Sequence, residues 1–348
     1  EVKKMKKRFS LLMALLLMMT FLTACGSGQS DESDQTDADS QVSSEETSGA
    51  DSWPNKTIYI TSTHSVGGDT DYNARLISKY LEEELGVDVV VSNITGGNGS
   101  TAMTEFQSME ADGYHFLMTN TVAIAGNEAS GMASFGYEAF DPVAIFGRES
   151  GDTLIASPDM PFDDVNSFIE YTIENPGKVR LGIATGGGTY AAAVMLQEAG
   201  ANVTAIDLGD GSERLAGVLG GHVDVAFCPF VLAKDYLENG DVKALCTLMS
   251  ERSAGMPDTP TASELGVEDL VLDAMDVCVA VKGTDPAVIE KMNAAIQNIV
   301  NNNEQFRSET EEYNFQKPFV LSVDDTTAQL QEQKDHFMSY ADLIQGKK

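Results

Sequence analysis

The sequence has 348 residues and 42% hydrophobic content, enough to bury the cores of two ordinary domains. Its 22 Lys and Arg face 54 Asp and Glu, which gives a formal net charge of −32. A chain this acidic repels phosphate backbones, so nucleic acid is excluded as a partner, and its 31 Gly and 10 Pro are too few for collagen.

The first 24 residues have the pattern of a secretory signal. Bases at positions 3–8 precede an apolar run, Phe9–Leu22, which is shorter than the ~20 residues that span a bilayer. The run ends in Leu-Thr-Ala-Cys, which resembles a bacterial lipobox, where the signal is cut before a cysteine that carries lipid. We predict a signal peptide at 1–24 and lipidation of Cys25. The alternative is a secreted protein in which Cys25 is incidental.

Residues 25–52 are predicted to form a disordered acidic tether. After Cys25 this segment contains eight acidic residues and no base, among Ser, Thr, Gln and Gly. Such a composition cannot bury enough apolar surface to offset the entropy of ordering the chain. A lipid on Cys25 and this tether predict an extracytoplasmic domain anchored to the bacterial cell membrane.

The body of the chain alternates β-rich runs with amphipathic helical patterns, which is typical of α/β folds with open sheets. The predicted strands are 57–61, 87–91, 114–118, two runs in 143–156, 179–184, 203–206, 223–227, 242–249 and 271–281. The more distinct predicted helices are 70–85, 190–199, 287–301 and 326–344.

The cysteines and histidines give no sign of a metal, a cofactor or a redox centre. Cys228, Cys246 and Cys278 stand in apolar runs typical of buried strands, so we favour core thiols over a disulfide. The sequence has no CxxC, no zinc spacing and no HxxxH pattern. We therefore predict no metal site and no cofactor.

Three glycine-rich loops follow predicted strands, at 64–71, 93–100 and 185–189. Ligands of open α/β sheets bind at the carboxyl ends of strands, where helix N-termini favour anions. Glycine lets backbone N–H groups approach such a ligand closely. Composition alone leaves two readings equally open, an anion site and tight turns without a ligand.

Short blocks in a fixed order resemble one family of receptors. Gly67-Gly68-Asp69-Thr70-Asp71 is similar to a Pro-Gly-Gly-Gly-Thr-Asp loop, and Leu219-Gly220-Gly221-His222-Val223-Asp224-Val225 to a Leu-Gly-Gly-Gln-Val-Asp-Val block. Further blocks stand at 86–93, 111–114, 140–144, 175–178, 257–266 and 282–286. Together they resemble the Bug-type extracytoplasmic solute receptors of tripartite tricarboxylate transporters.

The resemblance implies a type II periplasmic-binding-protein fold: two Rossmann-like α/β domains with a hinge and a cleft between them. Domain 1 would combine 53–154 with 250–348, and domain 2 would be 155–249. Such a receptor is not an enzyme. It would be a monomer that captures a small carboxylate in the cleft and presents it to a membrane permease, closing by a hinge motion.

The resemblance also implies a set of ligand-binding residues. They are Ser65, Gly67, Gly68, Asp69, Thr70, Asn120 and Thr121 on domain 1, and Thr185, Gly187, Gly188, Thr189, Gly209 and Asp210 on domain 2. Hydroxyl and backbone N–H groups of this set can donate to a carboxylate. Asp71 is expected to cap its helix rather than touch the solute. His64 is expected to face water rather than the solute.

Two departures from the family pattern bear on the solute. Asp69 replaces a glycine, which predicts a negative charge at the mouth of the cleft. Leu208-Gly209-Asp210 replaces a frequent Tyr-Lys-Gly, which predicts that a cation beside the solute is missing. We therefore expect a solute less negative than citrate, or an amino-acid-like zwitterion that pairs with Asp69 or Asp210.

Two other functions remain open at this point. A ligand sensor that presents its closed form to a signalling partner would use the same residues. A hydrolase has weaker support, because the sequence has no GxSxG elbow and no Gly-Lys-Ser/Thr ending a glycine loop.

Overall fold

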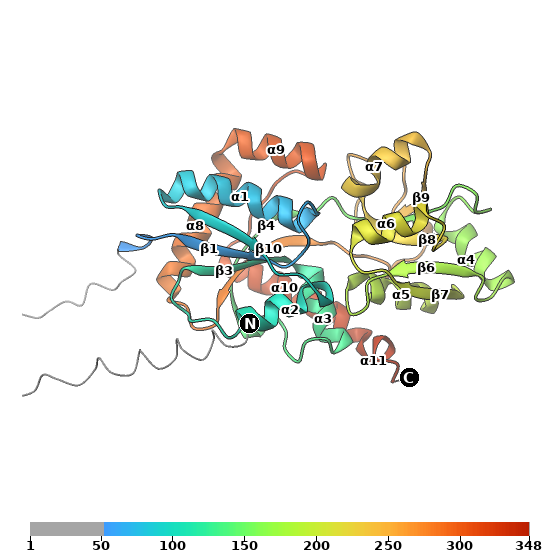
Figure 1. The fold of residues 1–348 in the computed structure, drawn as a ribbon, viewed down its shortest axis with the longest axis horizontal. Helices are drawn as coiled ribbons and strands as arrows, with labels where there is room; N and C mark the ends of the chain where they lie inside the picture. The colour runs from blue at the N-terminus through green and yellow to red at the C-terminus, as the bar shows by residue number, and fades with distance from the viewer. Residues whose placement is uncertain (1–51, 348) are drawn as a thin grey trace, which may run out of the picture. The chain divides into compact units, whose positions relative to one another are not determined.

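The computed structural model describes residues 52–347, drawn in colour in Figure 1. The predicted signal peptide, Cys25 and all but the last residue of the predicted tether lie outside the described residues. Between residues 52 and 347, no helix has both the length and the apolar character needed to cross a membrane.

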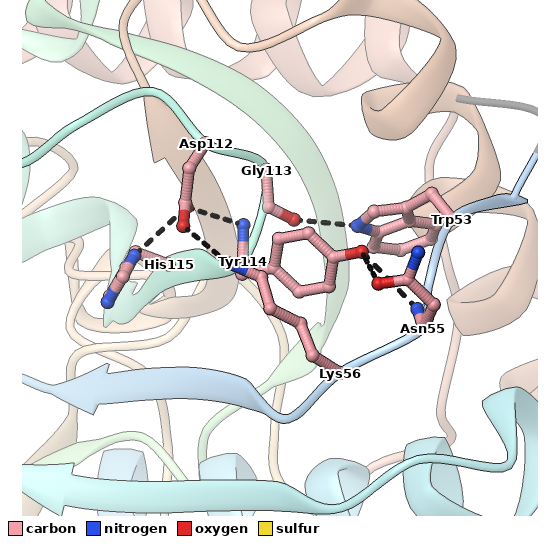
Figure 2. A network of polar contacts seen from close by, with 7 residues as sticks. All are labelled: Trp53, Asn55, Lys56, Asp112, Gly113, Tyr114 and His115. Carbon is pink, nitrogen blue, oxygen red and sulfur yellow. Dashed lines mark hydrogen bonds and ion pairs between the residues drawn. The ribbon is translucent and has the colours of Figure 1, made fainter. Parts of the chain in front are cut away.

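Residues 53–56, at the start of the described chain, form hydrogen bonds and an ion pair with residues 112–114, just before the third strand (Figure 2). The indole N–H of Trp53, which is 6% exposed, donates to the carbonyl of Gly113 at 2.8 Å. The Tyr114 hydroxyl donates to the side-chain oxygen of Asn55 at 3.0 Å. The Lys56 ammonium lies 3.2 Å from the Asp112 carboxylate. These contacts fix the position at which the folded part begins.

The first sheet has the strand order β2-β1-β3-β10-β4. Strand β1 pairs in parallel with β2 and β3, whereas β10 runs antiparallel to β3 and β4. Its strands are β1 (Ile58–Ser62), β2 (Val89–Asn93), β3 (His115–Asn120), β4 (Phe140–Arg148) and β10 (Met275–Val281).

Helices cover both faces of the first sheet, and its central strands β3 and β10 are buried on both sides. Along β10, Cys278 and Ala280 pack into one core while Val277 and Val279 pack into the other. In Figure 1, α1 and α9 lie on one side of the sheet and α2, α3 and α10 on the other. The helices are α1 (Asp69–Leu85), α2 (Ser100–Phe106), α3 (Thr121–Ser130), α8 (Pro286–Asn302), α9 (Glu304–Asn314), α10 (Val323–Ser339) and α11 (Ala341–Ile344), and short 3₁₀ turns stand at Gly97–Gly99, Tyr137–Ala139 and Ser263–Leu265.

The second sheet repeats this plan with the order β7-β6-β8-β5-β9. Strand β6 is parallel to β7 and β8, and β5 is antiparallel to β8 and β9. Its strands are β5 (Asp152–Ala156), β6 (Val179–Ile183), β7 (Val203–Asp207), β8 (Val225–Pro229) and β9 (Lys243–Thr247). Its helices are α4 (Val165–Glu174), α5 (Gly188–Glu198), α6 (Gly211–Leu219) and α7 (Phe230–Asn239).

The chain passes between the two sheets twice. It crosses at residues 149–151, from β4 to β5, and again at 248–274, from β9 to β10. The second crossing corrects the expectation of one extended run over 271–281. The strand begins only at Met275, because the Leu272 N–H is already bonded to the Leu248 carbonyl of the returning segment. We call the structure around each sheet a lobe.

The cysteine prediction is confirmed. Cys228, Cys246 and Cys278 lie in β8, β9 and β10, and all three are buried free thiols. Burial raises the pKa of all three thiols. They are therefore unreactive core residues.

Candidate solute-binding cleft

A cavity of about 600 Å³ lies between the two lobes. Ten of the thirteen predicted site residues line it: Ser65, Gly68, Asp69, Thr70, Asn120, Thr185, Gly188, Thr189, Gly209 and Asp210. The other three do not line it. The Gly67 N–H is bonded to Asp71, the Gly187 N–H to the Ala184 carbonyl, and the fully buried Thr121 hydroxyl accepts from the Met275 N–H.

Helices from both lobes begin at the wall of the cavity. The residues that line it include Gly68 and Asp69 at the start of α1, Val122 in α3, Gly188 in α5 and Gly211 in α6. The first N–H groups of a helix have no acceptor within the helix, and the helix dipole adds positive potential there. The cavity therefore combines backbone donors from both lobes, an arrangement suited to a carboxylate.

The loop before α1 is held by Asp71. Its carboxylate accepts from the Gly67 N–H at 2.9 Å, from Asn93 at 2.7 Å and from Arg75 at 3.0 Å. Burial opposes ionisation, but these hydrogen bonds together hold the pKa of Asp71 below its ordinary value. Asp71 does not line the cavity, so it stabilises the turn at Gly67, where the positive φ of 86° suits glycine.

Contacts between the lobes flank the cavity. The Ser65 hydroxyl, on the first lobe, donates to Asp210 on the second at 2.7 Å. The Ser130 hydroxyl at the end of α3 donates to the Gly186 carbonyl at 3.0 Å. A Cβ placed on Gly126 would lie 3.2 Å from the Gly188 nitrogen, so α3 and the start of α5 are almost in backbone contact. The two lobes are therefore closed on one another around the cavity.

Arg214 supplies the cation that the sequence was expected to lack. It is 5% exposed, lines the cavity, and donates to the carbonyls of Phe227 and Gly209 at 2.6 Å each. The expectation of a missing cation was therefore wrong. The sequence feature that could have predicted this cation is the capping box of Asp210 and Glu213. A capping box marks the start of a helix, here α6, and so places Arg214 at the beginning of that helix, at the cavity.

The side of the cavity next to the first crossing carries three carboxyl groups, Asp69, Glu149 and Asp152, which we call the acidic floor. Asp69 accepts from the Ser150 hydroxyl at 2.7 Å, and its other oxygen, Oδ1, has no partner. Glu149 accepts from Thr70 at 2.5 Å and from Asn120 at 3.3 Å.

Burial controls the ionisation of this floor. It raises the pKa of Asp69 to about 7, although the hydrogen bond from Ser150 acts against it. Burial and the charge of Asp69 raise the pKa of Glu149 to about 8. The prediction of a negative charge at the mouth of the cleft was wrong, because Asp69 is only 5% exposed and its raised pKa of about 7 leaves it partly protonated at neutral pH. Glu149 and Asp152 were not predicted as site residues.

His64 also lines the cavity, contrary to the expectation that it faces water. Its Nδ1 lies 2.8 Å from the Thr63 hydroxyl, and desolvation lowers its pKa to about 4. The ring is therefore neutral at physiological pH. Within residues 52–347, no group of three or more His, Cys, Asp or Glu side chains is placed to hold a metal ion.

Comparison with known proteins identifies the family. Residues 73–341 match the family described as the tripartite tricarboxylate transporter family receptor. The protein BugT of Bordetella pertussis is 30% identical over 254 residues, which cover 71% of this chain and 77% of BugT.

Solved structures show the same fold. MatC of Rhodopseudomonas palustris, with bound malate, has a TM-score of 0.73 at 22% identity and covers 83% of this chain and 100% of its own. Another R. palustris protein, with adipate, has a TM-score of 0.74 at 22% identity and covers 84% and 98%. The family and the periplasmic-binding-protein fold that the sequence predicts are thus confirmed. The chain belongs to the solute-binding receptors of the tripartite tricarboxylate transporter family.

Proposed function

We propose that this receptor clasps a small carboxylate-bearing solute in the cleft between its lobes and delivers it unchanged to a membrane permease. The observation that carries the proposal is the cavity itself, where N-termini of helices from both lobes meet. The malate and adipate held by structures of the same fold support a carboxylate as the solute.

We assign the solute carboxylate to the second lobe. Arg214 contributes a guanidinium to the cavity wall, and α5 begins at Gly188 and Thr189, which also line the cavity. The hydroxyl of Thr185 is a further donor at the wall. Charge-assisted hydrogen bonds of this kind are about twice as strong as neutral ones. Gly67, Thr121 and Gly187 are chain neighbours of lining residues and do not line the cavity themselves.

The chemistry of the cleft supports binding rather than catalysis, so we do not favour the hydrolase alternative. His64 is paired with Thr63 and keeps a pKa of about 4, which makes it a poor general base at neutral pH. Burial raises the pKa of the Cys228 thiol and removes it as a nucleophile. A solute recovered from the protein should therefore have its original mass.

The test is calorimetry of the purified protein with malate, adipate, citrate and amino acids. Native mass spectrometry of protein purified under mild conditions would detect a solute that copurifies with it. Stoichiometric binding of a carboxylate that is recovered unchanged is the expected result. Conversion of that carboxylate by the protein, or binding that survives a bulky substitution such as Gly188→Trp in the cleft wall, would contradict the proposal.

We also propose that lipid on Cys25 anchors the receptor to the membrane as a monomer. The protein with Cys25→Ala is expected to leave the membrane fraction and to keep its solute affinity. Fractionation followed by immunoblotting measures this. Ser27→Ala is the matched control and should stay with the membrane, and retention of the Cys25→Ala protein there would refute the anchor.

A further inference from the structure

We propose that the acidic floor of Asp69, Glu149 and Asp152 holds a protonated amine of the solute, so that this receptor prefers an amino-acid-like zwitterion to a plain di- or tricarboxylate. The inference rests on the proposed function and names the class of solute. Its basis is the set of buried groups on one side of the cavity.

Asp69 has a carboxylate oxygen that lacks a hydrogen-bond donor. Its Oδ1 is buried without a hydrogen-bond partner, in a residue that is 5% exposed and that lines the cavity. A buried carboxylate oxygen left without a donor costs free energy, about 1–3 kcal/mol and more when charged. A cationic donor entering the cavity would satisfy it.

The other two floor residues also lack a cationic partner in direct contact. Glu149, 8% exposed, accepts only from the neutral side chains of Thr70 and Asn120. The Oδ1 of Asp152 is buried without a partner. Arg214 acts on Asp152 through its charge, but its hydrogen bonds go to the carbonyls of Phe227 and Gly209. The floor therefore keeps unused capacity to bind a cation.

The remaining carboxylates of the cavity are already engaged. Asp207 accepts from the N–H groups of Thr185 and Gly209. Asp210 and Glu213 cap each other across the first turn of α6. These three hold loops of the second lobe, whereas the floor residues stand at the start of α1, in the first crossing and at the start of β5. The floor residues are thus the carboxyl groups of the cavity that remain able to accept a cation.

The total charge of the cavity points the same way. Six carboxyl groups line it against a single arginine. Citrate would bring three negative charges into this field, whereas a zwitterion places its carboxylate near Arg214 and the helix N-termini and its amine on the floor. No cluster within residues 52–347 is arranged to hold a metal ion, so an organic ammonium fits the floor better than a divalent cation.

Binding should depend on pH with a defined sign. The groups that face the floor are Asp276 from β10, Tyr313 from α9 and Arg214 from α6. Because burial raises the pKa of Asp69 to about 7 and of Glu149 to about 8, the empty floor carries protons at neutral pH. An ammonium favours the ionised carboxylates, so these protons leave to solvent as it binds.

The experiment compares matched solutes that differ by one amine: alanine with propionate, aspartate with succinate, and glutamate with glutarate. Calorimetry of the purified protein at pH 6.0 and 8.5, in buffers of different ionisation enthalpy, gives the affinity and the protons released. We expect at least one amine-bearing member to bind 30-fold or more tightly than its partner. Its affinity should rise about tenfold between these pH values, with release of a proton.

Two variants separate the floor from the rest of the protein. Asp69→Asn and Glu149→Gln keep the size of the side chain, and each should weaken binding of the amine-bearing solute tenfold or more without weakening its amine-free partner. Asp159→Asn, an exposed position outside the cavity, removes the same charge and should change neither affinity.

The outcomes distinguish this inference from the proposed function. Binding of succinate, glutarate or propionate as tight as that of the amine-bearing partner would overturn the ammonium site and leave the carboxylate receptor standing. Absence of binding by every carboxylate tested, with an empty cleft in native mass spectrometry, would contradict the proposed function and this inference together.

Discussion

Replacing Arg214 with Gln is expected to weaken solute binding by about 100-fold or more. Arg214 is the buried cation of the cavity, and loss of one partner from a buried charged contact costs about 2–5 kcal/mol, of which about 2.7 kcal/mol corresponds to 100-fold. The substitution also removes the donors to Gly209 and Phe227, so the loop that begins α6 loses its support. Calorimetry with aspartate and malate measures the affinity.

Thermal unfolding of the same protein shows whether the variant is folded. A drop in midpoint of several degrees is expected, with a cooperative transition, because two buried carbonyls lose their donor. Arg180→Gln is the matched control. Arg180 lies on β6, forms an ion pair with Asp224 on the second lobe and stands outside the cavity, so affinity should be unchanged. If folded Arg214→Gln protein binds within threefold of wild type, Arg214 does not contact the solute.

Replacing Glu149 with Gln is expected to change how stability depends on pH in the solute-free protein. The folded-state pKa of Glu149, about 8, lies above that of the unfolded chain, so folding favours the protonated form. Its stabilising contribution is full below the unfolded pKa and is lost as the pH rises through about 8. Glutamine has no proton to lose, so the free energy of unfolding of the variant should rise relative to that of wild type between pH 5 and 8.

The gain can reach about 1.4 kcal/mol per pH unit, or about 4 kcal/mol over that range, since one proton is involved. The stabilising contribution of Asp69, whose pKa is also raised, to about 7, falls as the pH rises. The contribution of His64, whose pKa is lowered to about 4, rises with pH instead. Both are present in each protein, so the difference between variant and wild type isolates Glu149 and its coupling to its neighbours.

Urea unfolding at pH 5, 6, 7, 8 and 9 gives the two curves. The exposed Glu110→Gln is the matched control and should follow wild type at every pH. Parallel curves for Glu149→Gln and wild type would show that Glu149 is ionised in the folded protein. In that case the acidic floor would be a solvated surface.

The parts of the fold that the sequence predicts are those with a strong local pattern. The runs at 57–61, 179–184 and 223–227 predict β1, β6 and β8, because most side chains of these strands are buried. The helix α9 was not predicted, because it is rich in charged and polar residues, and Phe306 is its one buried apolar side chain. The predicted helix over 326–344 is two helices, divided at Tyr340.

The residues of the candidate site likewise include some that the sequence predicts and some that it does not. Ser65, Asp69, Thr185 and Asp210 could be predicted, because each stands in a loop that directly follows a strand or begins a helix. Glu149 could not, because its place depends on Thr70, a contact that joins residues 79 positions apart in the chain. Local sequence carries no sign of such a long-range approach.

A crystal structure of the protein with its copurified or added solute shows whether both lobes hold an unaltered solute between helix N-termini. We expect density for an intact solute in the cavity, with its carboxylate within hydrogen-bonding distance of Arg214 or the first N–H groups of α5. Its amine should lie on Asp69 or Glu149. A solute bound outside the cavity, or a chemically changed one within it, would show that the cleft does not bind in this way.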